Sequence, residues 1–386
     1  MRGYGVFLIA ALVLTGCGGV HNTPQNVPLS GVALSAADPN AGGSPVLDDD
    51  LLIALSFSGG GMRAAAFSYG ALQAFNQTPI PARDGGGVLI DRVDFVSGVS
   101  GGSIPAAYFG LKKRAMLNDF RENFLLQNPE EALSTQMNLA NLGRGLSGGV
   151  NEDKRLSGWL NEHLFKGATF HELRRSRPRV WINASDIYNR TPFVFGQTAF
   201  NALCSDLGSY PVADAVAASS AVPVAFAPVV IESFGDKCQT PLPPKVERAI
   251  RDRNANPMLR AFALAISHYR DGTMKYVKLF DGGLVDNYGL SGFTISRLAA
   301  ERPFEPMTPH QAVKIRRAMF LLVDAGRGPS RKSWTAQLQG PAGAELVAAA
   351  SDTAIDASVR ASYTAFQQVI SDWQRQLKGW RCSLPP

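Results

Sequence analysis

The chain has 386 residues, 45% of them hydrophobic, which is enough to bury one large α/β core. Its formal net charge of +6 favours anionic partners such as lipid headgroups. No basic run is interleaved with aromatic residues, so the composition argues against nucleic acid as a partner, and no internal repeat is evident.

The N-terminus reads as an export signal. Arg2 precedes an apolar run over residues 6–14, which is too short to span a bilayer but has the length of a signal-peptide core. The run ends in Leu-Thr-Gly-Cys, which resembles the bacterial lipobox and implies cleavage after residue 16 and lipidation of Cys17. An unmodified secretory signal is the alternative. Gly18 is not the aspartate that retains such lipoproteins at the inner membrane, so the resemblance implies a lipid-anchored protein of the outer membrane, facing the periplasm, in a Gram-negative source.

The chain divides into three parts on this basis. Residues 1–16 are expected to be the signal peptide. Residues 17–47 would then hold the lipidated cysteine and a flexible linker rich in Pro, Asn, Ser and Gly. Residues 48–386 are expected to form the folded domain, with strands and helices that alternate and so favour a largely parallel sheet with helices on both faces.

A glycine-rich turn follows the first predicted strand, residues 51–57. The turn reads Ser58-Gly59-Gly60-Gly61-Met62-Arg63 and leads into an Ala-rich helix over about 64–75. Successive glycines at a helix N-terminus let backbone N–H groups face an anion. Because neither Gly-Lys-Ser/Thr nor G-x-G-x-x-G is present, we expect Gly59, Gly60 and Gly61 to form an oxyanion hole rather than a phosphate loop. Arg63 is expected to pin this loop, with a lipid phosphate as its alternative partner.

A second glycine-rich turn holds a serine. Gly98-Val99-Ser100-Gly101-Gly102 reads G-x-S-x-G, and it lies between a short apolar strand at 93–96 and apolar residues at helical spacing over 104–125. Strand, sharp turn and helix are the context of a nucleophile elbow, in which Gly98 and Gly102 flank a strained serine. The sequence therefore predicts Ser100 as a nucleophile. An ordinary flexible turn is the alternative.

A third turn holds an aspartate. Residues 276–280 form an apolar strand that ends in Asp281-Gly282-Gly283, so the carboxylate is expected at a strand tip. The alternative is a common Asp-Gly turn, and the sequence alone does not place Asp281 near Ser100. Asp324 ends another apolar run but lacks paired glycines, so we expect it to be structural.

The ordered set of these three turns resembles the patatin-like phospholipase family over about residues 50–326. Two further blocks carry the resemblance, the strand at 180–186 and the small-residue segment at 217–223. The resemblance implies a patatin-like three-layer α/β fold with a central, largely parallel sheet. We expect no cofactor and no metal. One departure is Tyr288-Gly289, where many relatives have a proline.

The resemblance also implies a lipid acyl hydrolase of the phospholipase A or lysophospholipase type, with Ser100 and Asp281 as a catalytic dyad and the other glycines of the three turns in support. Its substrates would be membrane phospholipids or lysophospholipids. Two alternatives are an acyltransferase or thioesterase with the same dyad, and a catalytically idle lipoprotein. A triad through His310 is a further alternative, since His310 follows Asp281 in the chain but lies in a predicted Pro-rich loop. Aspartate is a weaker base than histidine, so burial of Asp281 would have to raise its pKa.

Cysteines and the C-terminal region complete the predictions. With Cys17 lipidated, three pairings among Cys204, Cys238 and Cys382 are possible, of which we favour Cys204 with Cys238. We expect no zinc site, because no cysteine or histidine pair has close ligand spacing. Residues 110–175 are expected to be mostly helical around a Gly-rich break at 143–149, either as padding of the sheet edge or as a cap. Apolar residues recur at helical spacing over 343–380, and the expected core-facing stripe is Tyr363, Phe366, Val369, Ile370 and Trp373, with membrane contact as the alternative.

Overall fold

The computed structural model describes the folded part of the chain in several stretches. These are residues 23–29, 50–82, 85–127, 153–174, 177–223, 226–237, 241–326, 328 and 333–384. The predicted signal peptide, Cys17, the predicted linker apart from residues 23–29, the Gly-rich break at 143–149 and Cys238 lie outside the described residues. Residues 23–29 do not form the predicted flexible linker, because Asn26 is buried, its side-chain amide donates to Ser205 and Glu232, and the Leu29 N–H donates to the carbonyl of Cys204.

Within the described residues, the strands form one sheet of seven in the order β5-β6-β3-β2-β1-β7, with β4 also paired to β3. Strands β3, β2, β1 and β7 run parallel, whereas β4, β5 and β6 join antiparallel. The bounds are β1 Leu51–Phe57, β2 Phe95–Val99, β3 Arg179–Asp186, β4 Thr191–Val194, β5 Val229–Glu232, β6 Tyr276–Asp281 and β7 Arg317–Val323. The predicted largely parallel sheet is confirmed.

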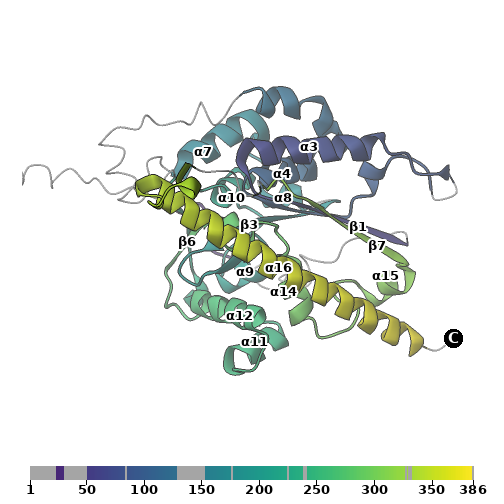
Figure 1. Cartoon of the computed structure of the whole chain (residues 1–386). Helices are drawn as coiled ribbons and strands as arrows, with labels where there is room; N and C mark the ends of the chain where they lie inside the picture. The colour runs from purple at the N-terminus through teal and green to yellow at the C-terminus, as the bar shows by residue number, and fades with distance from the viewer. Residues whose placement is uncertain are drawn as a thin grey trace, which may run out of the picture.

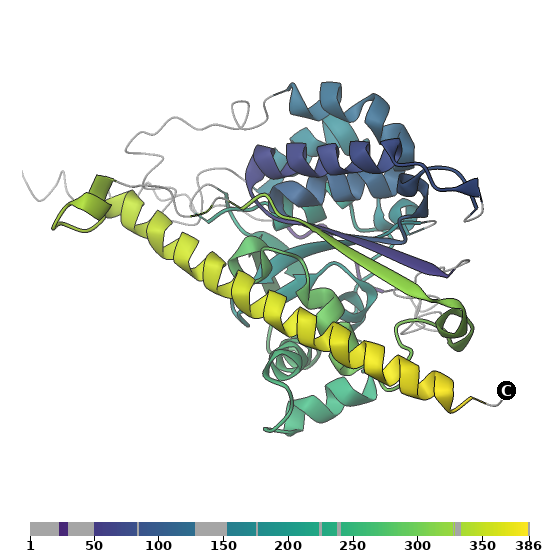
Figure 2. The same cartoon turned by 45° about the vertical axis from the view of Figure 1, so that its right-hand side comes forward.

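Helices cover both faces of the sheet, which gives a three-layer α/β fold. Figures 1 and 2 show α3 and α4 on one face, and α14 and α16 on the other, where α16 crosses the sheet diagonally. The helices are α3 Gly61–Gln77, α4 Ser103–Lys112, α7 Asp153–Leu160, α8 Phe170–Leu173, α9 Gln197–Ala202, α10 Val212–Ser219, α11 Pro244–Arg251, α12 Pro257–Arg270, α13 Gly283–Asp286, α14 Ser291–Ala299, α15 Pro309–Lys314 and α16 Gly343–Cys382. Shorter helical turns are η2 Leu89–Arg92, η3 Ser100–Gly102, η4 Lys113–Asn118, η5 Arg121–Leu125, η6 Asn161–Phe165, η7 Gly235–Lys237 and η8 Ser333–Ala336.

Side chains of β1 alternate between the two faces, as the period of a strand requires. Ile53, Leu55 and Phe57 belong to the main hydrophobic core, together with Val96 of β2 and residues of α3 and α4. Leu52 instead packs on the other face with Trp373 of α16 and residues around α15. The sheet is therefore buried on both faces, as expected for strands with nearly continuous apolar sequence.

The predicted helix over 104–125 is wrong as a single element. Helix α4 ends at Lys112 because Lys113 has a left-handed backbone (φ 55°), and the chain continues as the 3-10 turn η4 and the π-helical turn η5. Met116, Phe120 and Phe124 are nevertheless buried in the main core. Helical spacing of apolar residues thus identified the buried residues but not the break.

Helix α16 agrees with the predicted C-terminal helix. Phe366 and Trp373 of the predicted stripe are buried, and their rings contact Phe293 of α14. Tyr363 departs from the stripe, because its side chain is 42% exposed. Among the described residues, no helix combines the length and the apolar character that a membrane span requires.

The described residues include two of the four cysteines, Cys204 and Cys382. Cys204 is disulfide-bonded, and Cys382 is a free, exposed thiol. These observations exclude every pairing with Cys382, while Cys238, the expected partner of Cys204, lies outside the described residues. The Cys204–Cys238 bond stays a prediction.

Candidate active site

Ser100 stands on a strained turn between β2 and α4. Its φ of 50° lies in the left-handed region, which is uncommon for a residue with a side chain. Glycines are needed around it for steric reasons. A Cβ at Gly101 would lie 2.0 Å from the carbonyl oxygen of Gly61, and one at Gly98 would lie 2.6 Å from the Cα of Ser103. The turn therefore packs directly against α4 and the first glycine-rich turn.

Strand β3 brings the serine and the aspartate together. It lies between β2 and β6, so Val99 pairs with Asn183 on one side and Asp281 pairs with Ala184 on the other. The two residues are 181 positions apart in the chain, yet the Ser100 Oγ donates a hydrogen bond of 2.6 Å to the Oδ2 of Asp281. Both side chains are buried, with exposed fractions of 7% and 8%.

The Asp281 carboxyl group is held from several sides. Its Oδ1 accepts a 2.8 Å hydrogen bond from the Gly283 N–H, and its own backbone N–H donates to the carbonyl of Ala221. Burial raises the pKa of Asp281 to about 6, although the hydrogen bonds from Ser100 and Gly283 favour the ionised form and act in the opposite direction. The net effect is a pKa of Asp281 above the usual range of a carboxyl group.

The first glycine-rich turn lies beside the serine, and its three N–H groups differ. The Gly59 N–H donates to the carbonyl of Asn287, so it is already engaged. The N–H groups of Gly60 and Gly61, at the start of α3, donate to no other described residue. A Cβ at Gly59 would lie only 3.3 Å from the Ser100 Cβ, which places this turn in contact with the serine. Of the three predicted donors, two are therefore open.

Arg63 ties the same turn to the end of β7. Its Nε donates a 2.8 Å hydrogen bond to the carbonyl of Ala325. This contact is the loop-pinning role that the sequence favoured, and it spans residues far apart in the chain.

Ser219 is a site residue that the sequence reasoning missed as an individual. The Ser100 backbone N–H donates to the Ser219 Oγ at 2.8 Å, and that hydroxyl donates to the carbonyl of Asn183 at 2.6 Å. Ser219 is fully buried at the end of α10, and its own carbonyl accepts from the Gly282 N–H. The sequence did mark this position, because Ser219 lies in the small-residue segment at 217–223.

No histidine joins the pair within the described part of the chain. His268 contacts Asn189, and His163 stacks on Trp159. His310 is exposed and lies in the first turn of α15, not in a loop as predicted, because Thr308 caps this helix and Pro309 starts it. Helix α15 packs near Leu52 at the start of β1, whereas Ser100 lies beyond the opposite ends of the parallel strands.

Asp324 has a structural environment. Its Oδ2 accepts a 2.8 Å hydrogen bond from the Tyr288 hydroxyl, and its Oδ1 accepts one of 2.7 Å from the Gly326 N–H. Neither contact involves Ser100 or Asp281. Among the described residues, no cluster of three or more His, Cys, Asp or Glu side chains could hold a metal ion.

The arrangement brings together a buried hydroxyl, a buried base with a raised pKa and two open, exposed N–H donors from three separate turns. Such a set suits nucleophilic attack on a carbonyl, because it provides proton transfer and a place for the developing negative charge. A family model described as patatin-like phospholipase matches residues 55–294, a span that includes all three turns. A search of curated proteins finds no match to the chain.

Proposed function

This chain belongs to the patatin-like phospholipase family, and on that premise we propose that it hydrolyses carboxylic ester bonds of membrane phospholipids or lysophospholipids. The family supports a lipid acyl hydrolase in general. The observation that carries the finer proposal is the 2.6 Å hydrogen bond from the Ser100 Oγ to the Asp281 Oδ2. It places an alcohol in direct contact with a carboxylate, with no histidine between them.

In the proposed reaction, the Ser100 Oγ attacks the ester carbonyl carbon while its proton passes to the Asp281 Oδ2. The tetrahedral intermediate collapses, the bond to the leaving alkoxide breaks, and the protonated Asp281 returns the proton to that oxygen. Water then attacks the acyl-serine with Asp281 again as base, which releases the fatty acid and restores the hydroxyl of Ser100. The net reaction consumes one ester and one water.

Asp281 suits this role because its pKa is raised. An exposed carboxylate with a pKa near 4 is a poor acceptor for a serine proton, whereas burial raises the pKa of Asp281 to about 6. A general base works best when its pKa lies near the operating pH. The burial that the fold imposes thus offsets part of the disadvantage of having no histidine.

The open N–H groups of Gly60 and Gly61 would stabilise the oxyanion. Both lie at the N-terminus of α3, a 17-residue helix whose dipole favours negative charge there. The Gly59 N–H, which donates to Asn287, would hold the turn in place instead. The proposed oxyanion hole therefore has two N–H donors rather than the three that the sequence predicted.

Activity-based labelling tests the nucleophile. A fluorophosphonate probe should label the wild-type protein, and Ser100→Ala should abolish both labelling and release of fatty acid from a lipid panel analysed by mass spectrometry. Ser209→Ala, at an exposed serine, serves as the matched control and should behave as wild type. Labelling that persists in Ser100→Ala would refute the assignment. Adding an acceptor alcohol to the assay separates hydrolysis from acyl transfer.

We also propose that Cys17 carries lipid and tethers the domain to a membrane. The apolar run at 6–14 is too short to span a bilayer, and several acyl chains on one cysteine would anchor firmly. Mass spectrometry of the mature protein should find acylated Cys17 as the first residue, and Cys17→Ser should remain uncleaved at that site or become soluble. An unmodified Cys17 within a free N-terminus would contradict the tether.

A further inference from the structure

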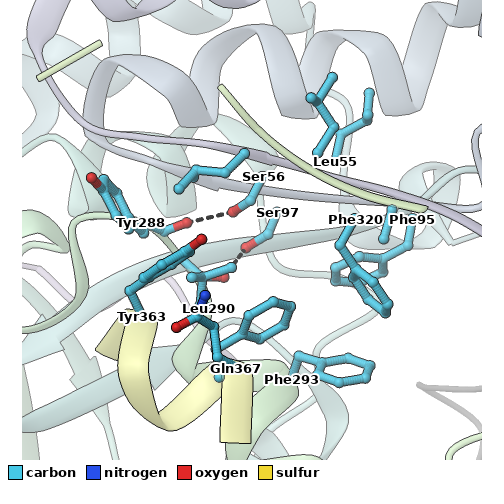
Figure 3. A pocket seen from close by; sticks show the side chains of 15 residues that line it. Leu55, Ser56, Phe95, Ser97, Tyr288, Leu290, Phe293, Phe320, Tyr363 and Gln367 are labelled. Atoms are coloured by element: carbon cyan, nitrogen blue, oxygen red, sulfur yellow. Dashed lines mark hydrogen bonds between the residues drawn. The ribbon is translucent and has the colours of Figure 1, made fainter. Parts of the chain in front are cut away.

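A cavity of about 460 Å³ lies on the face of the sheet opposite α3, between β1, β2, β7 and helices α14 and α16. It exists because three strand residues that point to this face are small, namely Ala54, Ser56 and Ser97. Figure 3 shows Tyr288 and Tyr363 toward one end of it and Phe95, Phe293 and Phe320 toward the other. The volume falls within the range of small-molecule sites in proteins, roughly 300–1,000 Å³.

The interior of the cavity offers no free hydroxyl donor from the strands. Its two strand hydroxyls already donate to backbone carbonyls, Ser56 to Tyr288 and Ser97 to Gly289, the latter at 2.7 Å. The remaining interior surface is largely aromatic and aliphatic. Because both hydroxyl donors are engaged and most of the lining is apolar, an apolar occupant is favoured.

Polar groups are instead available at the rim on α16. Tyr363 is 42% exposed and Gln367 is exposed, and neither side chain makes a hydrogen bond to another described residue. Figure 3 shows both projecting from the same helix beside the cavity. An apolar interior with free polar groups at the rim fits an amphiphile with one chain inside and its polar head outside.

The cavity is separate from the proposed active site but is connected to it. Neither Ser100 nor Asp281 lines it. Three successive carbonyls join the two regions, because those of Asn287, Tyr288 and Gly289 accept from the Gly59 N–H, the Ser56 hydroxyl and the Ser97 hydroxyl. This segment starts one residue after α13, which itself starts within the Asp281-Gly282-Gly283 turn.

We propose that this cavity is a non-catalytic binding site for the acyl chain of a single-chain lipid. The shared chemistry is one linear chain, which a free fatty acid or a lysophospholipid would supply. The choice of lipid rests on the proposed function, since both molecules are products or substrates of a lipid acyl hydrolase. The connecting segment requires glycine at position 289. Its φ is 66°, and an added Cβ would lie only 2.8 Å from the Ser97 Oγ.

Photo-crosslinking tests the site directly. The full-length Ser100→Ala protein, which would hydrolyse nothing, is mixed with palmitate or palmitoyl-lysophosphatidylcholine, each with a diazirine in mid-chain, and the labelled peptides are mapped. We expect labels on the peptides with Phe293, Phe320 and Phe366. Labelling by one probe or by both supports the site and identifies the source of the chain. Labels confined to peptides around residue 100 would overturn it.

Blocking variants show whether the label depends on the cavity. Ala54→Phe places a ring in the hollow and should reduce cavity labelling by about tenfold or more, because it displaces several methylenes of the chain. Ala74→Phe, on the exposed face of α3, is the matched control and should leave labelling unchanged. Gln367→Trp narrows the rim from an exposed position and should reduce labelling even if Ala54→Phe does not fold. Unchanged labelling in a folded Ala54→Phe protein or in Gln367→Trp would refute the proposal.

The result is independent of the proposed catalysis. If wild-type protein releases no fatty acid and Ser100 takes no fluorophosphonate, the proposed function fails, while the crosslinks still report on the cavity. If hydrolysis occurs but the cavity peptides stay unlabelled, only the second site fails.

Discussion

The two faces of the central sheet are packed to different degrees, although the same strands supply both. Toward α3 and α4, Ile53, Leu55 and Phe57 of β1 are buried at 0–2% exposure within the main core. Toward α16, Ala54 and Ser56 of the same strand line a cavity of about 460 Å³. The alternation that builds β1 thus produces one filled face and one hollow face.

The difference has a physical reason. The strained backbone of Ser100 persists only where its surroundings over-determine it, and the filled face does so through α3, α4 and the contacts of Gly98 and Gly101. The hollow face has no such demand, because neither Ser100 nor Asp281 lines its cavity. Dense packing is therefore concentrated where the proposed chemistry occurs.

The largest effect is expected from a change at Asp281, the proposed base. Asp281→Asn keeps the shape of the side chain but removes its capacity to accept a proton, so the rate of ester hydrolysis should fall by roughly 10² to 10⁴. Steady-state kinetics on a soluble ester substrate measures this. His310→Ala, at an exposed position in α15, is the control and should retain nearly full activity. A collapse of activity in the histidine variant with Asp281→Asn near normal would replace the dyad by a triad.

The next largest effect is expected on the free energy of unfolding when a residue of the filled face is truncated. Ile53 is fully buried in the main core, so Ile53→Ala should lower the free energy of unfolding by about 2–5 kcal/mol. Urea denaturation followed by circular dichroism measures the loss. A loss below about 1 kcal/mol would mean that this face tolerates voids as the other does, and the contrast between the faces would disappear.

A pH dependence of activity and stability follows from Asp281. Because the base must be ionised, kcat/KM should fall about tenfold per pH unit below the raised pKa of about 6. For stability the sign is opposite, since a carboxyl whose pKa is raised on folding stabilises the folded state only while it is protonated. Asp281→Asn should therefore melt above the wild type at pH 8, and the difference should shrink as the pH falls from about 6 toward 4. Equal melting temperatures at pH 8 would show that burial does not penalise the charge.

The smallest effect is expected on the hollow face. Ala54→Leu adds apolar volume where space exists, so it should leave the free energy of unfolding unchanged or raise it by about 0.5–2 kcal/mol. The same denaturation experiment compares it with Ile53→Ala, its neighbour on the strand. A destabilisation of about 1–3 kcal/mol, typical of overpacking, would show that this face has no open space.

Much of the fold follows from local sequence patterns. The strand at 51–57 and its glycine-rich turn, the serine turn and the aspartate turn were all predicted at the positions where β1, β2 and β6 end. Period-two and helical spacings of apolar residues depend only on neighbours in the chain, so they can be read without a structure. The break after α4 could not be read, because the left-handed backbone of Lys113 has no mark in the residue types around it.

The sequence by itself determined the chemical groups at the candidate site, since glycine spacing and strand ends are local properties. Which of these groups meet depends on the tertiary structure. The register of β3 between β2 and β6 joins Ser100 to Asp281. Ser219 reaches the Ser100 N–H from α10, and the carbonyl of Asn287 holds Gly59, which is distant from it in sequence. The cavity likewise depends on how α16 packs over three small residues. Contacts between distant elements are set by packing of the whole chain, so no local pattern contains them.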